Sequence, residues 1–224
     1  MKRIFFITGT DTGVGKTVLT ALLAGDLRRR GLPVAALKPV SSGGRADARV
    51  LQTVLDGMLT LDEINPWHFR APVAPLLAAR REHRRVNMAD VVAHVRSTQT
   101  RFDPVLVEGA GGLLSPLGDD FDSRDLLSVL RAIPLVVASD RLGAVNHVRL
   151  TLAVLPRAAA ARTRVLFMAP PKPDASSGTN AELLGKFFDR KRIFRLPWMG
   201  RKPATEKNLA DPRVRRVLRA LTAM

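Results

Sequence analysis

Short apolar runs alternate with stretches of helical periodicity along the chain. The first run, residues 3–8, is rich in Ile and Phe and stops at Gly9. Residues 16–30 then place apolar side chains at helical spacing, and Gly31 ends that pattern. The pattern predicts a buried strand that is followed directly by an amphipathic helix.

The same two patterns predict the remaining elements. Further strands are expected at residues 33–40, 104–108, 134–139, 164–168 and 193–196. Further helices are expected at residues 46–55, 88–100, 145–161 and 211–221. Pro156 must end or kink the third of these helices, whereas Pro212 suits the first turn of the last one, with Asp211 as its N-cap.

Nearly continuous apolar strands separated by helices are typical of a parallel sheet that is covered on both faces. We therefore expect an α/β fold, a doubly wound and mostly parallel sheet in three α/β/α layers. The chain has 224 residues and no internal repeat or low-complexity linker, so residues 1–224 are expected to form a single domain. Ligands of such sheets bind outside the carboxyl ends of the strands, so the loops there should carry the chemistry.

The loop between the first strand and the first helix reads GTDTGVGKT over residues 9–17. Its glycines let backbone N–H groups approach phosphates closely, and the helix N-terminus adds partial positive charge. Lys16 is expected to reach the β- and γ-phosphates of a nucleoside triphosphate, and the Thr17 hydroxyl is expected to bind Mg²⁺. Five residues separate Gly9 from Gly15, one more than in the usual phosphate loop. A glycine-rich turn that binds nothing is the alternative.

Three charged residues elsewhere are candidates for the same site. Glu108 ends an apolar strand, where a carboxylate without a partner is costly to bury, so it is a candidate metal-holding acid. Asp47 begins a predicted helix, where it either complements the helix dipole or binds Mg²⁺ through oxygen. Lys38 ends the second strand before Ser-Ser-Gly-Gly, and it is either a ligand of phosphate or a solvated strand-end lysine.

The segment LGAVNH at residues 142–147 follows the fourth strand and opens a helix. Backbone N–H groups at a helix start suit a carboxylate, although a helix cap without a ligand explains the segment equally well.

Composition excludes several kinds of catalytic and metal chemistry. The chain has no cysteine, which excludes disulfides, Cys-ligated zinc, iron–sulfur clusters and thiol nucleophiles. No apolar run is long enough to span a membrane, and the run at residues 4–7 is too short for a signal peptide, so we expect a cytoplasmic protein.

The net charge of +16 is uneven, since residues 157–224 hold 16 basic and 5 acidic residues. It indicates either an anionic partner such as nucleic acid or a bias of composition toward Arg and Ala.

Together these motifs resemble the dethiobiotin synthetases, the ATP-dependent cyclases of biotin synthesis. The chain carries six of the family's motifs in the family's order. They are GTDTGVGKT at residues 9–17, KPVSSG at 38–43, NPWHFRAPVAPLLAA at 65–79, LVEGAGGLLSPL at 106–117, LGAVNH at 142–147 and LPW at 196–198. The resemblance covers nearly the whole chain.

The resemblance implies a role for each matching position. The catalytic group comprises Thr12, Lys16 and Lys38. The nucleotide would contact Gly13, Val14, Gly15, Lys16, Thr17, Glu108 and Pro197. The substrate would contact Thr12, Lys38, Ser42 and Gly111, with its carboxylate received across a dimer interface by Leu142, Gly143, Ala144, Val145 and Asn146. Mg²⁺ would be held by Thr17, Asp47 and Glu108.

The resemblance also implies a reaction and its partners. The substrates would be 7,8-diaminononanoate, CO2 and ATP, and the enzyme would be a homodimer that uses Mg²⁺. One amine takes up CO2 as a carbamate, which attacks the γ-phosphate to give a carbamic–phosphoric anhydride. The second amine then closes the ureido ring and releases phosphate.

Two features depart from the family's pattern. Residues 169–173 contain neither the Asn that commonly reads adenine nor an Asp, so another nucleoside triphosphate is also a candidate. The chain has no Tyr to contact the substrate, and residues 176–180 are the expected substitute.

Three alternatives to this function stay open at this point. A partition-type ATPase switch that binds DNA shares the fold, but it carries an extra Lys early in its phosphate loop, and residues 10–14 contain none. A cobyrinate-type synthetase would need a Cys nucleophile in its glutamine-hydrolysing domain. An inactive paralogue is the third. A membrane partner is not expected, and a nucleic-acid partner is not favoured.

Overall fold

Six parallel strands form the central sheet. The structure, a computed structural model, describes residues 2–200 and 204–223. The strands lie in the order β2-β5-β1-β6-β7-β8, and each neighbouring pair is parallel. Their bounds are β1 Ile4–Gly9, β2 Ala35–Leu37, β5 Val105–Gly112, β6 Ile133–Ser139, β7 Arg164–Met168 and β8 Ile193–Leu196. The predicted parallel α/β sheet is confirmed.

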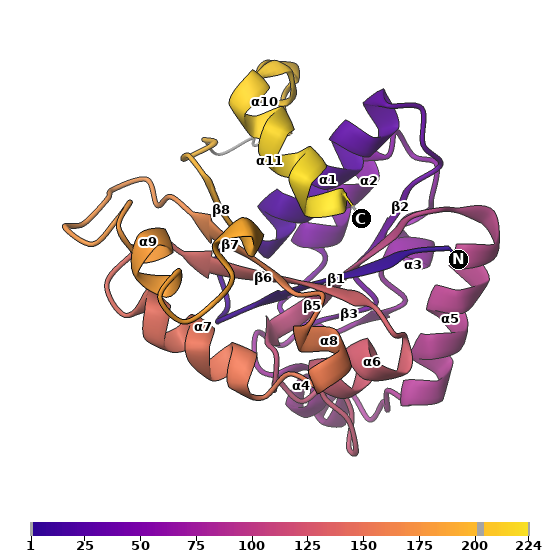
Figure 1. The fold of residues 1–224 in the computed structure, drawn as a ribbon. Coiled ribbons are helices and arrows are strands. Elements are labelled where there is room, and N and C mark those ends of the chain that lie inside the picture. Colours follow the sequence, from indigo (N-terminus) through magenta and orange to yellow (C-terminus); the bar gives the residue numbers. More distant parts are fainter. Residues whose placement is uncertain (1, 201–203, 224) are drawn as a thin grey trace.

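Helices cover both faces of this sheet in three layers (Figure 1). On one side lie α1 Lys16–Arg29, α2 Ala46–Val54, α10 Glu206–Ala210 and α11 Pro212–Thr222. On the other lie α6 Ser123–Val129, α7 Ala144–Ala153 and α8 Arg157–Ala160. The remaining helices are α3 Leu61–Ile64, α4 Pro75–Arg81, α5 Met88–Arg101, α9 Asn180–Leu184 and the 3-10 turn η1 Arg190–Arg192.

The strand order places the loops that carry polar residues side by side. β1 lies between β5 and β6. The chain first adds β2 and β5 on one side of β1 and then β6, β7 and β8 on the other side. The loops after β1, β5 and β6 therefore meet at one edge, which is where doubly wound sheets bind ligands.

The structure corrects three predicted boundaries. The strand expected at residues 33–40 is split into β2 and a separate two-stranded sheet of β3 Val40–Ser41 with β4 Trp67–His68. Pro39 separates the two pieces, and the Lys38 N–H donates to the Ile64 carbonyl instead of to the main sheet. The strand at 104–108 continues to Gly112 across a register shift beside β1. The helix at 145–161 is two helices, α7 and α8, because Pro156 precedes the second one.

The hydrophobic core is continuous across the sheet, and α1 forms one wall of it. Leu22 on α1 is fully buried in this core. We expect Leu22→Ala to lower the free energy of unfolding by about 2–5 kcal/mol, because the substitution leaves a cavity. Met58→Ala, at a side chain that is 45% exposed, should change it by about 0.5 kcal/mol or less. Urea unfolding measures both, and equal effects would contradict this packing.

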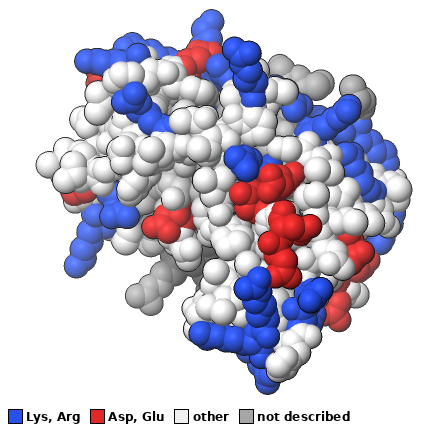
Figure 2. All heavy atoms as spheres, turned by 90° about the horizontal axis from the view of Figure 1, so that it is seen from below, with Lys and Arg blue, Asp and Glu red and all other residues white. Residues whose placement is uncertain are grey.

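Basic and acidic side chains are interleaved on the face seen from below (Figure 2). Lys and Arg form separate groups around acidic side chains in the middle of this face. Ion pairs join basic and acidic side chains on the surface, including Arg80 with Asp119 at 2.5 Å. Helix α11, on the opposite side of the sheet, exposes a row of arginines: Arg213, Arg215, Arg216 and Arg219. Among the described residues, no helix is long and apolar enough to cross a membrane.

Candidate active site

A cavity of about 740 Å³ opens at the carboxyl edge of the sheet, beside β1 and β5. It brings together ten of the residues that the sequence singled out. They are Thr12, Gly13, Gly15, Lys16, Thr17, Lys38, Ser42, Asp47, Glu108 and Gly111. These positions are up to 99 residues apart in the chain, from Thr12 to Gly111 (111 − 12), so the fold assembles the cavity from several loops.

The phosphate loop has the conformation that its glycines permit. Gly13 and Gly15 have φ values of 74° and 103°, in the left-handed region that other residues rarely adopt. Gly15 is the N-cap of α1 and, as a glycine, offers no side chain to the first turn of this helix. The first N–H groups of α1 therefore face the cavity side of the loop, where the helix dipole favours an anion. Lys16 folds back over the loop and donates to the Asp11 carbonyl at 2.7 Å.

Two cations and two carboxylates meet on the floor of the cavity. Lys38 donates from Nζ to Glu108 Oε1 at 2.6 Å and to Asp47 Oδ2 at 2.8 Å. The Thr17 hydroxyl donates to the same Glu108 oxygen at 2.7 Å. Lys38 and Glu108 are almost fully buried, so Lys38 is no solvated strand-end lysine. Asp47 lies in the first turn of α2, as expected from the sequence.

Burial and the neighbouring charges set the protonation of these groups. Burial, and next the positive charge of Lys38, lowers the pKa of Lys16 to about 8 from its ordinary 10.5. Burial also acts to lower the pKa of Lys38, but the charges of Glu108 and Asp47 outweigh it and hold that pKa above the ordinary value. Burial acts to raise the pKa of Asp47, and Lys38 outweighs it, so that pKa is lowered. Lys38 is therefore charged near neutral pH, and Lys16 is the more easily deprotonated of the two.

The oxygen atoms around Glu108 fit a magnesium ion. Glu108 Oε2 is buried and, among the described residues, has no hydrogen-bond partner. A buried carboxylate oxygen without a partner is costly, and a cation beside it removes that cost. Thr17 and Asp47 supply the hydroxyl and the second carboxylate on the same cavity wall. A hydroxyl and two carboxylates are the hard oxygen ligands that Mg²⁺ prefers.

Pro197 and Val14 lie outside this cavity. Pro197 lines a second cavity of about 420 Å³, together with Pro170, Arg195 and Trp198. That cavity opens beside the ends of β7 and β8. The phosphate loop is close to the same strands, because a Cβ at Gly15 would lie 3.1 Å from the Met168 side chain. Val14 is buried and packs against Gly9, so only its backbone is available to a nucleotide.

The α7 start lies outside both cavities. Of the five residues proposed there, Leu142 is 78% exposed and Ala144 is buried. Gly143 has a φ of 85° and caps α7 without a side-chain hydrogen bond. The Ala144 N–H donates to the Arg141 carbonyl at 3.1 Å, whereas Gly143, Asn146 and the apolar Leu150 further along α7 are exposed.

Several residues of the large cavity were not predicted as site residues. They are Val18, Ser41, Pro72, Val73, Ala74, Pro75, Ala110 and Ser115. Residues 72–75 belong to the segment NPWHFRAPVAPLLAA, so the motif itself was the available signal. Ser115 is tied to the glycine run, since its hydroxyl accepts from the Gly112 N–H at 2.9 Å. A side chain at Gly111 would collide with that hydroxyl.

Comparisons with known proteins identify the family. The profile of a family described as an AAA domain matches residues 3–202. The ATP-dependent dethiobiotin synthetase BioD of Anaeromyxobacter dehalogenans (strain 2CP-C) is 41% identical over 201 residues, which are 88% of this chain and 90% of that protein. The chain belongs to the dethiobiotin synthetase family. The Bacillus licheniformis member is 40% identical over 66% of this chain and 65% of its own, and the Methanocaldococcus jannaschii member is 36% identical over 66% and 72%.

Among solved structures, the MinC:MinD cell division protein complex of Aquifex aeolicus contains a similar chain. The TM-score is 0.59 at 13% identity, and the match covers 98% of this chain and 93% of that one. At this identity, the likeness shows that the two chains share a fold. The sequence relatives favour the synthetase over the partition-type switch.

Proposed function

We propose that this chain is an ATP-dependent dethiobiotin synthetase that closes the ureido ring on 7,8-diaminononanoate with CO2. The observation that carries the proposal is the cavity in which Lys16, Lys38 and Thr17 meet Glu108 beside a phosphate loop. Such an arrangement stabilises anions and supplies no covalent nucleophile, which suits a reaction whose nucleophiles all belong to the substrate.

The steps of this reaction place negative charge on the carbamate and on the transferred phosphoryl group. One substrate amine attacks CO2 and loses a proton, which gives a carbamate. A carbamate oxygen attacks the γ-phosphorus, and the bond from that phosphorus to the β–γ bridging oxygen breaks, so ADP leaves. The second amine attacks the carbamate carbon, loses its proton and expels phosphate. Lys16 and Lys38 carry the positive charge next to the carbamate and the transferred phosphoryl group.

The remaining residues of the cavity orient the reactants. Thr12, Ser42 and Gly111 line the part where the diamine would lie, and residues 13–17 hold the phosphates through backbone N–H groups. Thr17, Asp47 and Glu108 would hold Mg²⁺, which neutralises charge on the β- and γ-phosphates when it is bound. We assign the nucleotide base to the second cavity, at Pro197, because it lies along the sheet edge from the phosphate loop.

We further propose a homodimer in which the α7 start of one chain receives the substrate carboxylate bound to its partner. The supporting observations are the exposure of the α7 start at Leu142, Gly143 and Asn146 and the exposed apolar Leu150 on the same helix. In this proposal the whole chain acts as one domain. It works in the cytoplasm, where ATP is available.

A steady-state assay tests the proposed activity. Diaminononanoate, bicarbonate, Mg²⁺ and each nucleoside triphosphate in turn are supplied, and the ureido product and phosphate are both measured. We expect one phosphate for each dethiobiotin formed, and no product when any component is omitted. Absence of ureido product with every nucleotide would overturn the proposal.

Mixing two inactive variants tests the shared site. Lys16→Ala removes the phosphate-loop lysine, and Asn146→Asp places a negative charge where the carboxylate would bind. Each variant alone should have little activity. A mixed dimer contains one site with both residues intact, so random mixing should restore about one quarter of wild-type activity.

The control for this mixing experiment combines both substitutions in one chain and mixes it with either single variant. In every one of those dimers both chains lack the same residue, either Lys16 or Asn146, so no shared site is intact and we expect no gain of activity. Failure of the Lys16→Ala and Asn146→Asp mixture to gain activity, although subunits exchange, would contradict a site shared between chains.

A further inference from the structure

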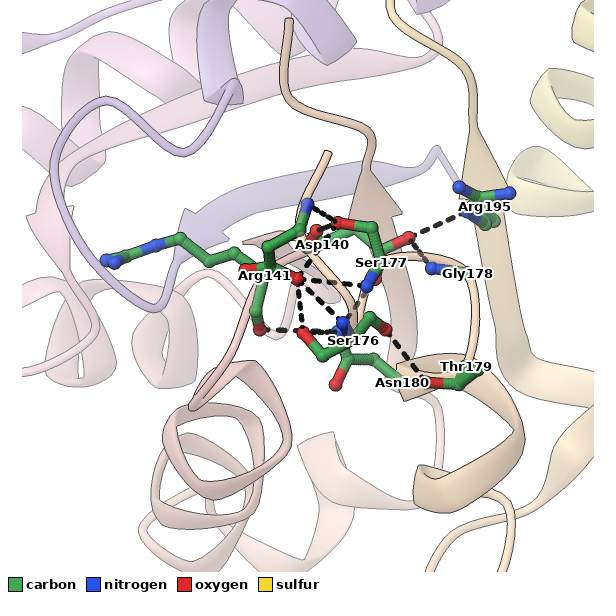
Figure 3. Close-up of polar contacts among 9 residues, drawn as sticks. Asp140, Arg141, Ser176, Ser177, Gly178, Thr179, Asn180 and Arg195 are labelled. Atoms are coloured by element: carbon green, nitrogen blue, oxygen red, sulfur yellow. Dashed lines mark hydrogen bonds and ion pairs between the residues drawn. The ribbon is translucent and has the colours of Figure 1, made fainter. Parts of the chain in front are cut away.

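Asp140 is a buried carboxylate that lies outside the cavity of Lys16 and Glu108. It follows β6 directly, and its side chain is 1% exposed. Its Oδ1 accepts from Asn180 Nδ2 at 2.8 Å, and its Oδ2 accepts from Gly178 N at 2.9 Å and from Arg195 Nε at 2.7 Å (Figure 3). A buried carboxylate is costly unless donors satisfy both of its oxygens. Three donors from two other segments do so here.

One arm of this network ends at the second cavity. Arg195 belongs to β8, and its side chain is 45% exposed although its Nε is bound to Asp140. Its guanidinium also packs beside Gly178, where a Cβ would lie 3.6 Å from Nη2. Arg195 lines the cavity of about 420 Å³ with Pro197 and Trp198. Asp140 therefore fixes a cationic part of that cavity's wall.

The other arm holds the turn before α7. Asn180 Nδ2 donates also to the Arg141 carbonyl at 3.2 Å. In the same loop, Asp174 Oδ1 accepts from the Ser176 N–H at 2.9 Å, and Asp174 Oδ2 accepts from the Leu142 N–H at 2.9 Å. The loop of residues 174–180 is thus hydrogen-bonded to residues 140–142. Its place on the sheet edge depends on the bonds that Asn180 and Gly178 make to Asp140.

We propose that Asp140 is a positioning residue that fixes the wall of the base cavity and the start of α7 together. The inference rests on the proposed function, which assigns the nucleotide base and the substrate carboxylate to these two places. Asp140 touches neither ligand. It acts through Arg195 on one side and through residues 178–180 on the other.

The substitution Asp140→Asn tests this role at nearly constant size. An amide replaces one acceptor oxygen by an N–H donor, which then faces the donors of Arg195, Gly178 or Asn180. Both arms of the network should loosen. We expect the KM for ATP and the KM for diaminononanoate each to rise about tenfold, while kcat stays within about threefold of wild type. A purely structural role would lower the melting temperature and leave both KM values unchanged.

Asp26→Asn is the matched control. Asp26 is also a buried carboxylate with an arginine partner, since Arg30 lies 3.5 Å from it on α1, and it contacts neither cavity. We expect this variant to change stability and neither KM. The inference would be overturned if soluble Asp140→Asn kept both KM values within about twofold of wild type. A loss of kcat alone would overturn it as well.

Two single-arm variants keep the test decisive if Asp140→Asn does not fold. Arg195→Gln removes the donor on the cavity side and should raise mainly the KM for ATP. Asn180→Ala removes the donor on the α7 side and should raise mainly the KM for diaminononanoate. Soluble variants with both KM values unchanged would overturn the inference.

Failure of the proposed function gives a different result from failure of this inference. If the wild type forms no ureido product, the proposed function falls, and calorimetric ATP binding decides the inference. Asp140→Asn must then weaken ATP binding about tenfold relative to wild type and to Asp26→Asn. Equal ATP affinities would overturn it.

Discussion

Replacing Lys16 with alanine is expected to lower kcat at least about 10³-fold. Lys16 supplies a buried positive charge at the phosphate loop, where negative charge gathers in the transition state of phosphoryl transfer. Water cannot replace that charge, because the cavity holds the side chain away from bulk solvent. Coupled measurement of ADP release and dethiobiotin formation in single-turnover conditions reports the loss directly.

Lys207→Ala is a suitable control for Lys16→Ala. Lys207 is an exposed lysine on α10, so its removal changes the net charge equally without touching the cavity. We expect wild-type kcat for this variant. A Lys16→Ala enzyme that keeps more than about one tenth of wild-type kcat would show that Lys16 does not stabilise the transferred phosphoryl group.

Glu108→Gln is expected to shift the Mg²⁺ concentration for half-maximal rate upward by at least about tenfold and to lower kcat/KM about 10²-fold at fixed Mg²⁺. Glu108 Oε2 is buried and has no hydrogen-bond partner within the part of the chain that the structure describes, and Oε1 accepts hydrogen bonds from Thr17 and Lys38. The amide keeps the size of the side chain but removes a negative charge and one acceptor. Titration of the rate with Mg²⁺ separates loss of metal affinity from loss of folding.

The matched control for Glu108→Gln is Glu206→Gln, at an exposed glutamate that pairs with Arg29 on the surface. Its Mg²⁺ dependence should equal that of the wild type. An unchanged Mg²⁺ dependence in the folded Glu108→Gln enzyme would remove Glu108 from the set of metal ligands.

The sequence pattern located all six strands of the main sheet, some with wrong boundaries, and missed several short helices. The strands at residues 164–168 and 193–196 were predicted to the residue, because each is a short apolar run and a Pro follows shortly after it in the sequence. Helices α3, α4 and α6 have four to seven residues and were missed, since one or two turns show no clear period. The capping box of Thr60 and Glu63 was nevertheless a usable signal for α3.

The candidate site was predictable where a motif places chemistry at the end of a strand. Lys38 follows β2, Lys16 opens the helix after β1 and Glu108 lies on β5, and the structure brings all three into one cavity. The contact of Lys38 with both Glu108 and Asp47 was not predictable, because it depends on how Pro39 turns the chain out of the sheet. The network around Asp140 was also missed, since its donors come from segments 38 to 55 residues away.

Oxygen transfer from labelled bicarbonate to phosphate tests the central claim most directly. In the proposed reaction, a carbamate oxygen attacks the γ-phosphorus and leaves with phosphate when the ring closes. With fully ¹⁸O-labelled bicarbonate and unlabelled ATP, we predict one ¹⁸O atom in each phosphate released and one in the ureido oxygen of dethiobiotin. Released phosphate that contains no ¹⁸O would show that water, and not the carbamate, attacks ATP. That result would contradict the account.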